Sequence, residues 1–162
     1  APAIHADFSG GRERLDLRYA TVSAVTDPEA PAREILPQLL EHMAAHRQAE
    51  LDARQCLSGP HKDDLTVELD GADAKTYASQ GQTRTAALSL KLGCREIFFH
   101  DAGEWPVLLL DDVLSELDRR RQEFVLNRIG GGQVFITCCE DERLENLKEG
   151  AVFHIHGGAL VG

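Results

Sequence analysis

An apolar run that ends in two carboxylates constrains the fold of this chain more than any other feature. Val107 to Leu110 are all apolar, and Asp111 and Asp112 follow directly. Such a run is typical of a strand buried on both faces of a parallel sheet, where ligands bind beyond the carboxyl ends of the strands. It predicts an α/β protein in which one aspartate holds Mg²⁺ on a nucleoside triphosphate and the other orients water. The alternative is an acidic helix N-terminus, because Asp is a common helix cap.

A second segment, upstream of this run, predicts a capped helix. Ser79 and Gln82 have the spacing of a capping box, in which each side chain bonds the backbone amide of the other residue. Free amides at such a start, beside the small Gly81, can bind phosphate. Alternatively, the segment is only the start of an ordinary core helix. Helical spacing predicts one buried apolar face, formed by Ala87, Leu90, Cys94 and Ile97 with Leu88 and Leu92 beside them.

The remaining pattern predicts alternating strands and helices. The expected elements are a strand or hairpin within residues 5–26, a helix through about residues 39–55, a strand over 65–69 closed by a turn at 70–71, a helix over about 118–129, a buried strand over 134–137, and terminal strands over 151–156 and 159–161. The strand, helix and strand from 107 to 137 have the spacing of one crossover in a parallel sheet.

Composition narrows the class of protein. With 162 residues, 43% of them hydrophobic, the chain can bury one core of ordinary size. No stretch approaches the roughly 20 apolar residues of a membrane span, and no basic-then-apolar leader occurs, so a soluble, cytoplasmic protein with no membrane partner is expected. The net charge of −10 offers no broad basic face for DNA. The triplet from Arg119 to Arg121 is either a local basic patch or a solvated helical turn.

Four segments, in this order, resemble motifs of the RecF family of DNA-repair ATPases, which are relatives of SMC and ABC-type ATPases. The segments are Gly59 to Leu65, similar to the Gly-Pro-His-basic-Asp-Asp element that distinguishes the family, Ser79 to Gln82, similar to the signature sequence, Leu108 to Asp112, similar to a Walker B strand, and Ser115 to Asp118, similar to a D-loop. The similarity is strongest from about residue 58 to 137.

The resemblance implies the fold and its division. The chain is expected to be the C-terminal lobe of an ABC/SMC-type P-loop ATPase head, a parallel-sheet core with flanking helices, together with part of a helical arm or lid subdomain. Residues 1–57 would belong to the sheet and arm, and residues 58–162 to the C-terminal half of the head. No Gly-x-x-x-x-Gly-Lys-Ser/Thr occurs in the sequence. The phosphate loop is therefore expected in an N-terminal half absent from this chain, which alone should not hydrolyse ATP.

The resemblance also implies roles for particular residues. Asp111 would help to hold Mg²⁺ in its own subunit, while Asp112 positions water. The signature residues Ser79, Gln80, Gly81 and Gln82 would cap the γ-phosphate of ATP bound by the partner subunit of a homodimer, and the D-loop residues Ser115 and Asp118 would cross the dimer interface.

Two further sites keep alternatives open. Thr137 stands near the place where the superfamily usually has a histidine that contacts γ-phosphate, so Thr137 makes that contact or the contact is absent. His61, Lys62 and Asp63 would form a family-specific loop of unassigned role. Alternatively, that loop is a turn fixed by Gly59 and Pro60.

The function implied by the resemblance is that of a recombination mediator. It would be a weak ATPase that dimerises on ATP at gapped or junction DNA and, with RecR and RecO, promotes RecA loading in DNA repair, recombination, replication restart and the SOS response. Two alternatives remain. One is another SMC-like or ABC-type head, although residues 28–58 leave room for only one or two helices rather than a long coiled coil. The other is a non-hydrolysing scaffold of the same fold.

Overall fold

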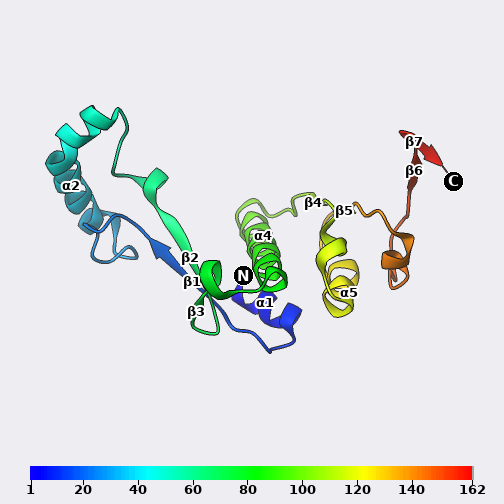
Figure 1. The fold of residues 1–162 in the computed structure, drawn as a ribbon. Coiled ribbons are helices and arrows are strands. Elements are labelled where there is room, and N and C mark those ends of the chain that lie inside the picture. Colours follow the sequence, from blue (N-terminus) through cyan, green and yellow to red (C-terminus); the bar gives the residue numbers. More distant parts are fainter. Residues whose placement is uncertain (162) are drawn as a thin grey trace. The chain divides into compact units, whose positions relative to one another are not determined.

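The computed structural model describes residues 1–161, which divide into two compact units. One unit joins residues 1–14 to the chain from residue 78 onwards, and the other comprises residues 15–77. The division predicted between residues 57 and 58 therefore falls inside the second unit. The first unit contains α1 (Pro2–Ser9), α4 (Gln80–Ala102), β4 (Leu108–Leu110), η2 (Val113–Glu116), α5 (Arg119–Asn127), β5 (Val134–Ile136), η3 (Asp141–Leu144), β6 (His154–His156) and β7 (Ala159–Val161) (Figure 1).

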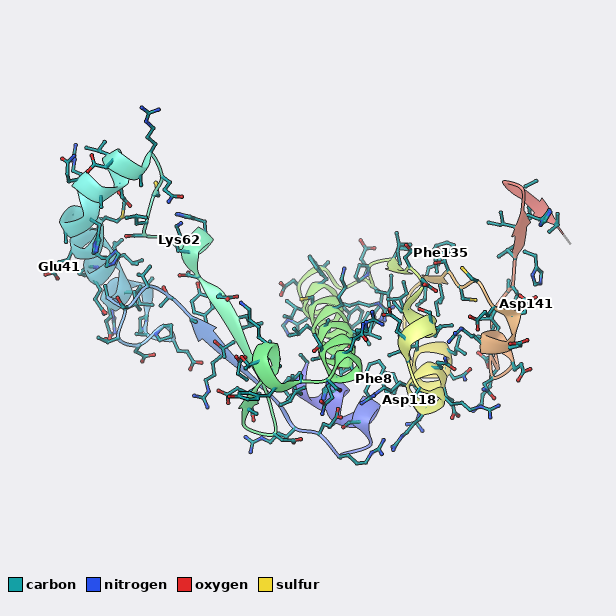
Figure 2. All side chains as sticks on the ribbon, viewed as in Figure 1. Phe8, Glu41, Lys62, Asp118, Phe135 and Asp141 are labelled. Carbon is teal, nitrogen blue, oxygen red and sulfur yellow. The ribbon has the colours of Figure 1, made fainter. Side chains whose placement is uncertain are left out.

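The core of the first unit lies where α1, α4, α5 and β4 meet. Phe8 from α1 is 1% exposed and packs against Phe124 of α5, with ring centroids 4.0 Å apart. Figure 2 labels Phe8 in this position between the helices. The buried cluster also contains Leu88, Leu92, Leu108, Leu110, Leu114, Leu117 and Val125. Burial of these side chains holds the strand ends and the two helix starts in place.

The predicted parallel pairing is confirmed, but the strand is not buried on both faces. β4 and β5 are parallel, with Leu108 opposite Val134 and Leu110 opposite Ile136. Successive side chains of a strand point to opposite faces. Leu108 and Leu110 are buried on the helix side, whereas Leu109 is 70% exposed and Phe135 is half exposed. The helices of the described residues thus cover one face of this two-stranded sheet, and the apolar run reflects a second apolar face that they leave open.

Residues 2–9 form a helix, so the range of 5–26 predicted to hold a strand or hairpin begins too early. Pro2 stands in the first helical turn, and Gly10 ends the helix in a left-handed conformation with φ 67°. The strand prediction came from the alternating residues around 15–19, and those residues do form β1 (Leu15–Ala20). The alternation therefore located the strand but not its start.

The buried face of α4 also differs from the prediction. Leu88 and Leu92 are buried as expected, but Ile97 is 61% exposed and Ala87 and Cys94 are exposed as well. The reason is α1, which approaches α4 through small residues. A Cβ on Gly93 would lie 2.9 Å from the backbone nitrogen of Ala1, and the buried His5 lies 3.3 Å from the hydroxyl of Ser89. Close approach and a hydrogen bond decide which face is buried, and a count of apolar residues misses both.

The second unit is an antiparallel sheet with a long helix. It contains β1, α2 (Ala32–Ala53), η1 (Pro60–Lys62), β2 (Asp64–Leu69), β3 (Ala72–Asp73) and α3 (Ala74–Tyr77). β1 pairs with β2 along its full length, and β2 turns into β3. Asp70 and Gly71 both have positive φ, as the predicted tight turn requires. The predicted helix starts earlier than expected and contains Pro37, and none of its residues is buried.

The two terminal strands are also confirmed, although the first begins at residue 154 rather than 151, and they form a hairpin. β6 and β7 are antiparallel, with His154 opposite Val161, and every residue of both strands is exposed. Among the described residues, no helix combines the length and the apolar character needed to cross a membrane.

Two glycines with nearly the same positive φ give a matched test of packing beside α4. Gly131 and Gly103 have φ of 74° and 76°, but a Cβ on Gly131 would lie 2.5 Å from Trp105, whereas a Cβ on Gly103 meets nothing within 4 Å. We expect Gly131→Ala to lower the free energy of unfolding by about 1–3 kcal/mol more than Gly103→Ala, because only the former overpacks a neighbour. Urea denaturation of both variants measures this difference, and equal losses would contradict the packing described.

Candidate nucleotide site and dimer motifs

Asp111, Asp112 and Thr137 come together at the carboxyl ends of the two parallel strands. The hydroxyl of Thr137, which follows β5, donates a hydrogen bond of 2.5 Å to Oδ1 of Asp111. The same hydroxyl oxygen accepts from the backbone amide of Asp112 at 3.0 Å. Both aspartates and Thr137 are exposed. Parallel pairing brings residues 25 and 26 positions apart into one cluster, open to solvent at the edge where α/β sheets bind ligands.

Asp112 has a backbone conformation that non-glycine residues rarely adopt. Its φ is 48° and its ψ 28°, in the left-handed region, and its carbonyl oxygen accepts a hydrogen bond of 2.8 Å from the hydroxyl of Ser115. Asp tolerates this region better than most residues, but strain of this kind is concentrated at functional sites. This rare conformation therefore stands directly at the pair of adjacent aspartates, between the end of β4 and η2.

The D-loop residues lie between this cluster and α5. Ser115 is partly exposed within η2, and Asp118 is exposed and caps α5 by accepting from the amide of Arg121 at 3.0 Å. Arg143 braces η2 by donating to the carbonyl oxygen of Leu114 at 2.9 Å. Asp118 is thus fixed at a helix start, with both carboxylate oxygens bonded to Arg121 and half of its side chain exposed.

The signature residues form the capped helix start that the sequence predicts. The hydroxyl of Ser79 accepts from the amide of Gln82 at 3.3 Å, and the side-chain carbonyl of Gln82 accepts from the amide of Ser79 at 2.9 Å. Ser79 and Gln80 are exposed, and Gly81 is partly exposed. Because the Ser79 oxygen acts as an acceptor within the helix, its hydroxyl proton can be donated outward to an anion. The side chain of Gln82 is occupied by contacts within the chain.

Glu13 is a functional candidate that the sequence analysis missed, and its partner Arg121 was considered there only as part of a basic triplet. Arg121 is only partly exposed and binds both Asp118 and Glu13, so it is not the solvated residue that a helix start would suggest, although Arg119 and Arg120 are exposed. Glu13 lies 108 residues from Arg121 along the chain. No local pattern signals such a contact, because it depends on how α1, α4 and α5 pack.

The loop of His61, Lys62 and Asp63 lies in the second unit, and its hydrogen bonds are to residues of that same unit. Nε2 of His61 is 3.1 Å from the carbonyl oxygen of Cys56, and Asp63 accepts a hydrogen bond from the hydroxyl of Tyr19. Lys62 is exposed, and Figure 2 shows it labelled beside the start of β2. Of the three loop residues, His61 and Lys62 are both exposed, whereas Asp63 is only partly exposed.

The hydrogen bond between Tyr19 and Asp63 predicts a measurable shift in the pKa of the Asp63 carboxyl. Hydrogen bonds from Tyr19 and then Thr21 lower the pKa of the Asp63 carboxyl, and the same bond to Asp63 raises the pKa of Tyr19. Because the folded pKa of Asp63 is depressed, its stabilising contribution is present above the unfolded pKa and is lost as pH falls through the folded pKa. Tyr19→Phe should move the pKa of Asp63 back towards its ordinary value, as NMR titration can measure. An unchanged pKa would show that the contact does not form.

The arrangement defines a class of protein. A parallel strand pair ending in paired aspartates, with a short turn after it and a capped helix before it, has the fold of the C-terminal lobe of an ABC- or SMC-type ATPase head. No family model matches the chain. Over an alignment of 164 positions that covers 99% of the chain, it is 43% identical to the DNA replication and repair protein RecF of Bacillus subtilis (strain 168). Over an alignment of 163 positions it is 43% identical to that of Lysinibacillus sphaericus (strain C3-41).

Solved structures of RecF are also similar to this chain. A structure of the recombination mediator protein RecF with ATP, in the RecFOR pathway, matches 99% of this chain with a TM-score of 0.77 and 33% identity, and one with ATPrS matches 98% with a TM-score of 0.74. The chain belongs to the RecF family and corresponds to its C-terminal part. It spans 44% of the length of the two curated relatives named above.

Proposed function

We propose that this chain supplies the signature, Walker B and D-loop elements of a RecF-type DNA-repair protein that binds ATP and hydrolyses it slowly. The observation that carries the proposal is the cluster of Asp111, Asp112 and Thr137 at the ends of adjacent parallel strands, in a chain similar to RecF over 99% of its length. The RecF structures with ATP support nucleotide binding by the complete protein.

The donor atoms of the cluster fit Mg²⁺. They are carboxylate and hydroxyl oxygens, the hard ligands that Mg²⁺ prefers, and Mg²⁺ usually binds through one or two carboxylates together with nucleotide phosphates. Bound there, Mg²⁺ would neutralise charge on the phosphates. We assign Asp111, whose carboxylate is held by Thr137 directly after β4, to hold the ion, and the neighbouring Asp112 to orient and accept a proton from water.

The hydrogen bonds of Thr137 favour one of the two alternatives left open by the sequence, namely that Thr137 does not contact the γ-phosphate. Its hydroxyl proton is directed to Asp111, and its oxygen receives the amide of Asp112. A hydroxyl has one proton to donate, so this hydroxyl cannot at the same time donate to a γ-phosphate. We propose that Thr137 positions the two aspartates rather than sensing the phosphate.

The signature is proposed to act across a homodimer. The outward hydroxyl of Ser79 and the amides at the start of α4, a 23-residue helix, suit a phosphate oxygen carried by a second subunit. Ser115 and Asp118 would meet that subunit beside it. ATP would then stabilise the closed dimer through contacts made only in that state.

The proposed biological setting is the repair of gapped or junction DNA together with RecR and RecO, with RecA loading as the outcome. The relatives are named DNA replication and repair proteins, and the similar structures belong to the RecFOR pathway. The exposed Lys62 is the residue of the family-specific loop best suited to a phosphate of DNA. A cytoplasmic location is proposed with this role.

A scaffold without turnover would need none of the ordered contacts between Thr137 and the aspartates.

The experiment joins this sequence to the N-terminal part of the Bacillus subtilis relative. We expect ATP with Mg²⁺ to convert the joined protein from monomer to dimer in sedimentation, and the dimer to prefer gapped over uniform duplex DNA in a competition assay. The 162-residue chain alone should neither dimerise with ATP nor hydrolyse it. A joined protein that binds ATP but stays monomeric would contradict the proposal.

A further inference from the structure

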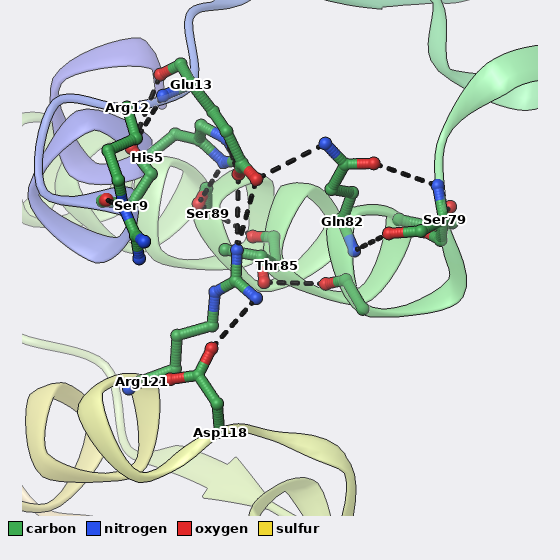
Figure 3. A network of polar contacts seen from close by, with 12 residues as sticks. His5, Ser9, Arg12, Glu13, Ser79, Gln82, Thr85, Ser89, Asp118 and Arg121 are labelled. Carbon is green, nitrogen blue, oxygen red and sulfur yellow. Dashed lines mark hydrogen bonds and ion pairs between the residues drawn. The ribbon is translucent and has the colours of Figure 1, made fainter.

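Glu13 lies at the centre of a polar network in the first unit (Figure 3). Its carboxylate lies 3.3 Å from Nε2 of His5 and accepts hydrogen bonds of 3.3 Å from Nε2 of Gln82 and from a guanidinium nitrogen of Arg121. The side chains of Glu13 and Arg121 are 16% and 14% exposed, and that of His5 is fully buried. Limited exposure reduces screening of these charges by salt.

The network joins two motifs that are far apart in the sequence. Gln82 belongs to the capping box at the start of α4, where its other side-chain atom holds the amide of Ser79. Arg121 belongs to the first turn of α5 and also bonds the carboxylate of Asp118 at 3.1 Å. One carboxylate, that of Glu13, therefore connects the signature helix start with the D-loop helix start.

A second contact joins the same two regions. Arg84, in the second turn of α4, forms an ion pair with Glu116 at the end of η2. The side chains of Arg84 and Glu116 are 34% and 42% exposed, so this ion pair is more accessible to solvent than the Glu13 network. Two independent links between the same pair of motifs indicate that their relative position is fixed by more than core packing.

We propose that Glu13 is a positioning residue that holds the signature helix start and the D-loop helix start in one fixed relation, so that both engage a second subunit in a single step. This inference rests on the ATP-dependent dimer proposed above. Association orders surface groups at a cost in conformational entropy, and groups already ordered in the free protein avoid that cost. Glu13 itself touches no nucleotide in this account, and acts only through Gln82 and Arg121.

The chemistry of the network requires a charged carboxylate at position 13. Glutamate presents two oxygens and a negative charge, which can bind the Arg121 guanidinium and accept from Gln82 at once. Glutamine has nearly the same shape but only one acceptor oxygen and no charge. Glu13→Gln therefore weakens the link, because it removes the charge and the second acceptor oxygen while preserving the volume of the side chain.

The test uses the joined protein described above, with Glu13→Gln and the control Asp7→Asn. Asp7 is an exposed carboxylate on α1, six residues from Glu13. We expect Glu13→Gln to weaken ATP-dependent dimerisation roughly tenfold or more in sedimentation, through loss of preorganisation. Its affinity for a fluorescent ATP analogue should stay unchanged, and Asp7→Asn should alter neither quantity. A residue that merely supports folding would lower both affinities together.

Hydrogen exchange on the 162-residue chain provides a second readout. Amides of residues 79–84 and 118–122 should exchange faster together in Glu13→Gln than in Asp7→Asn, while amides around Phe8 should not change. The variant Arg84→Gln, which breaks the more exposed link, should shift dimerisation in the same direction by a smaller factor. Dimerisation of Glu13→Gln equal to the control, or faster exchange at only one of the two segments, would overturn the inference. If the unsubstituted joined protein stays monomeric, the proposed function fails, and the exchange data still decide whether Glu13 couples the motifs.

Discussion

Replacing Asp112 by asparagine in the joined protein is expected to lower ATP turnover about 10²–10⁴-fold, the range that loss of a general base produces. ATP binding should persist, because Asp111 and its hydrogen bond from Thr137 remain. The ATP-bound dimer should therefore last longer than that of the unsubstituted protein. Turnover of radiolabelled ATP and dimer lifetime in gel filtration measure the two effects.

Two comparisons make this result specific. Asp111→Asn should weaken Mg²⁺-dependent nucleotide binding as well as turnover, because the proposed ion ligand is lost. Asp101→Asn, at the exposed end of α4, should leave both unchanged. Identical nucleotide binding and dimer lifetime in the Asp111 and Asp112 variants would show that the two carboxylates do not divide the roles as proposed.

Placing arginine at Ser79 is expected to abolish ATP-dependent dimerisation. The substitution removes the outward hydroxyl and puts a bulky side chain where the partner's γ-phosphate should dock. Loss of the cap costs about 1 kcal/mol, too little to unfold a domain of ordinary stability. The variant should therefore bind ATP as a folded monomer, as sedimentation and nucleotide titration together can show.

Ser79→Ala separates the lost cap from the added bulk. It removes the same hydrogen bond to the amide of Gln82 without filling the surface beside Gly81. We expect it to weaken dimerisation less than Ser79→Arg does. Full ATP-dependent dimerisation of Ser79→Arg would mean that this segment is only a capped core helix.

The elements that the sequence predicts best are those with a local chemical cause. The capping box at Ser79 and Gln82, the turn at Asp70 and Gly71, and the start of a helix near residue 118 each depend on residues within a few positions. Parallel pairing of β4 with β5 was predictable because the crossover spacing leaves few alternatives.

The errors have a common cause in contacts between distant segments. The helix at residues 2–9 and the buried polar face of α4 depend on each other, since His5 meets Ser89 and Ala1 meets Gly93. The exposure of Leu109 depends on what covers the second face of the sheet, which strand periodicity does not report. Glu13 escaped notice for the same reason, because its partners lie 69 and 108 residues away.

The central claim is that the signature of one subunit completes the site formed by Asp111 and Asp112 of the other. Mixing the Ser79→Arg and Asp112→Asn proteins tests it most directly, since each alone has no complete site in a trans arrangement. A mixed dimer would combine an intact signature from the Asp112→Asn subunit with intact aspartates from the Ser79→Arg subunit. ATP turnover of the mixture should then rise well above the sum of the separate proteins. If signature and aspartates act within one subunit, mixing restores nothing, and turnover equal to that sum would contradict the account.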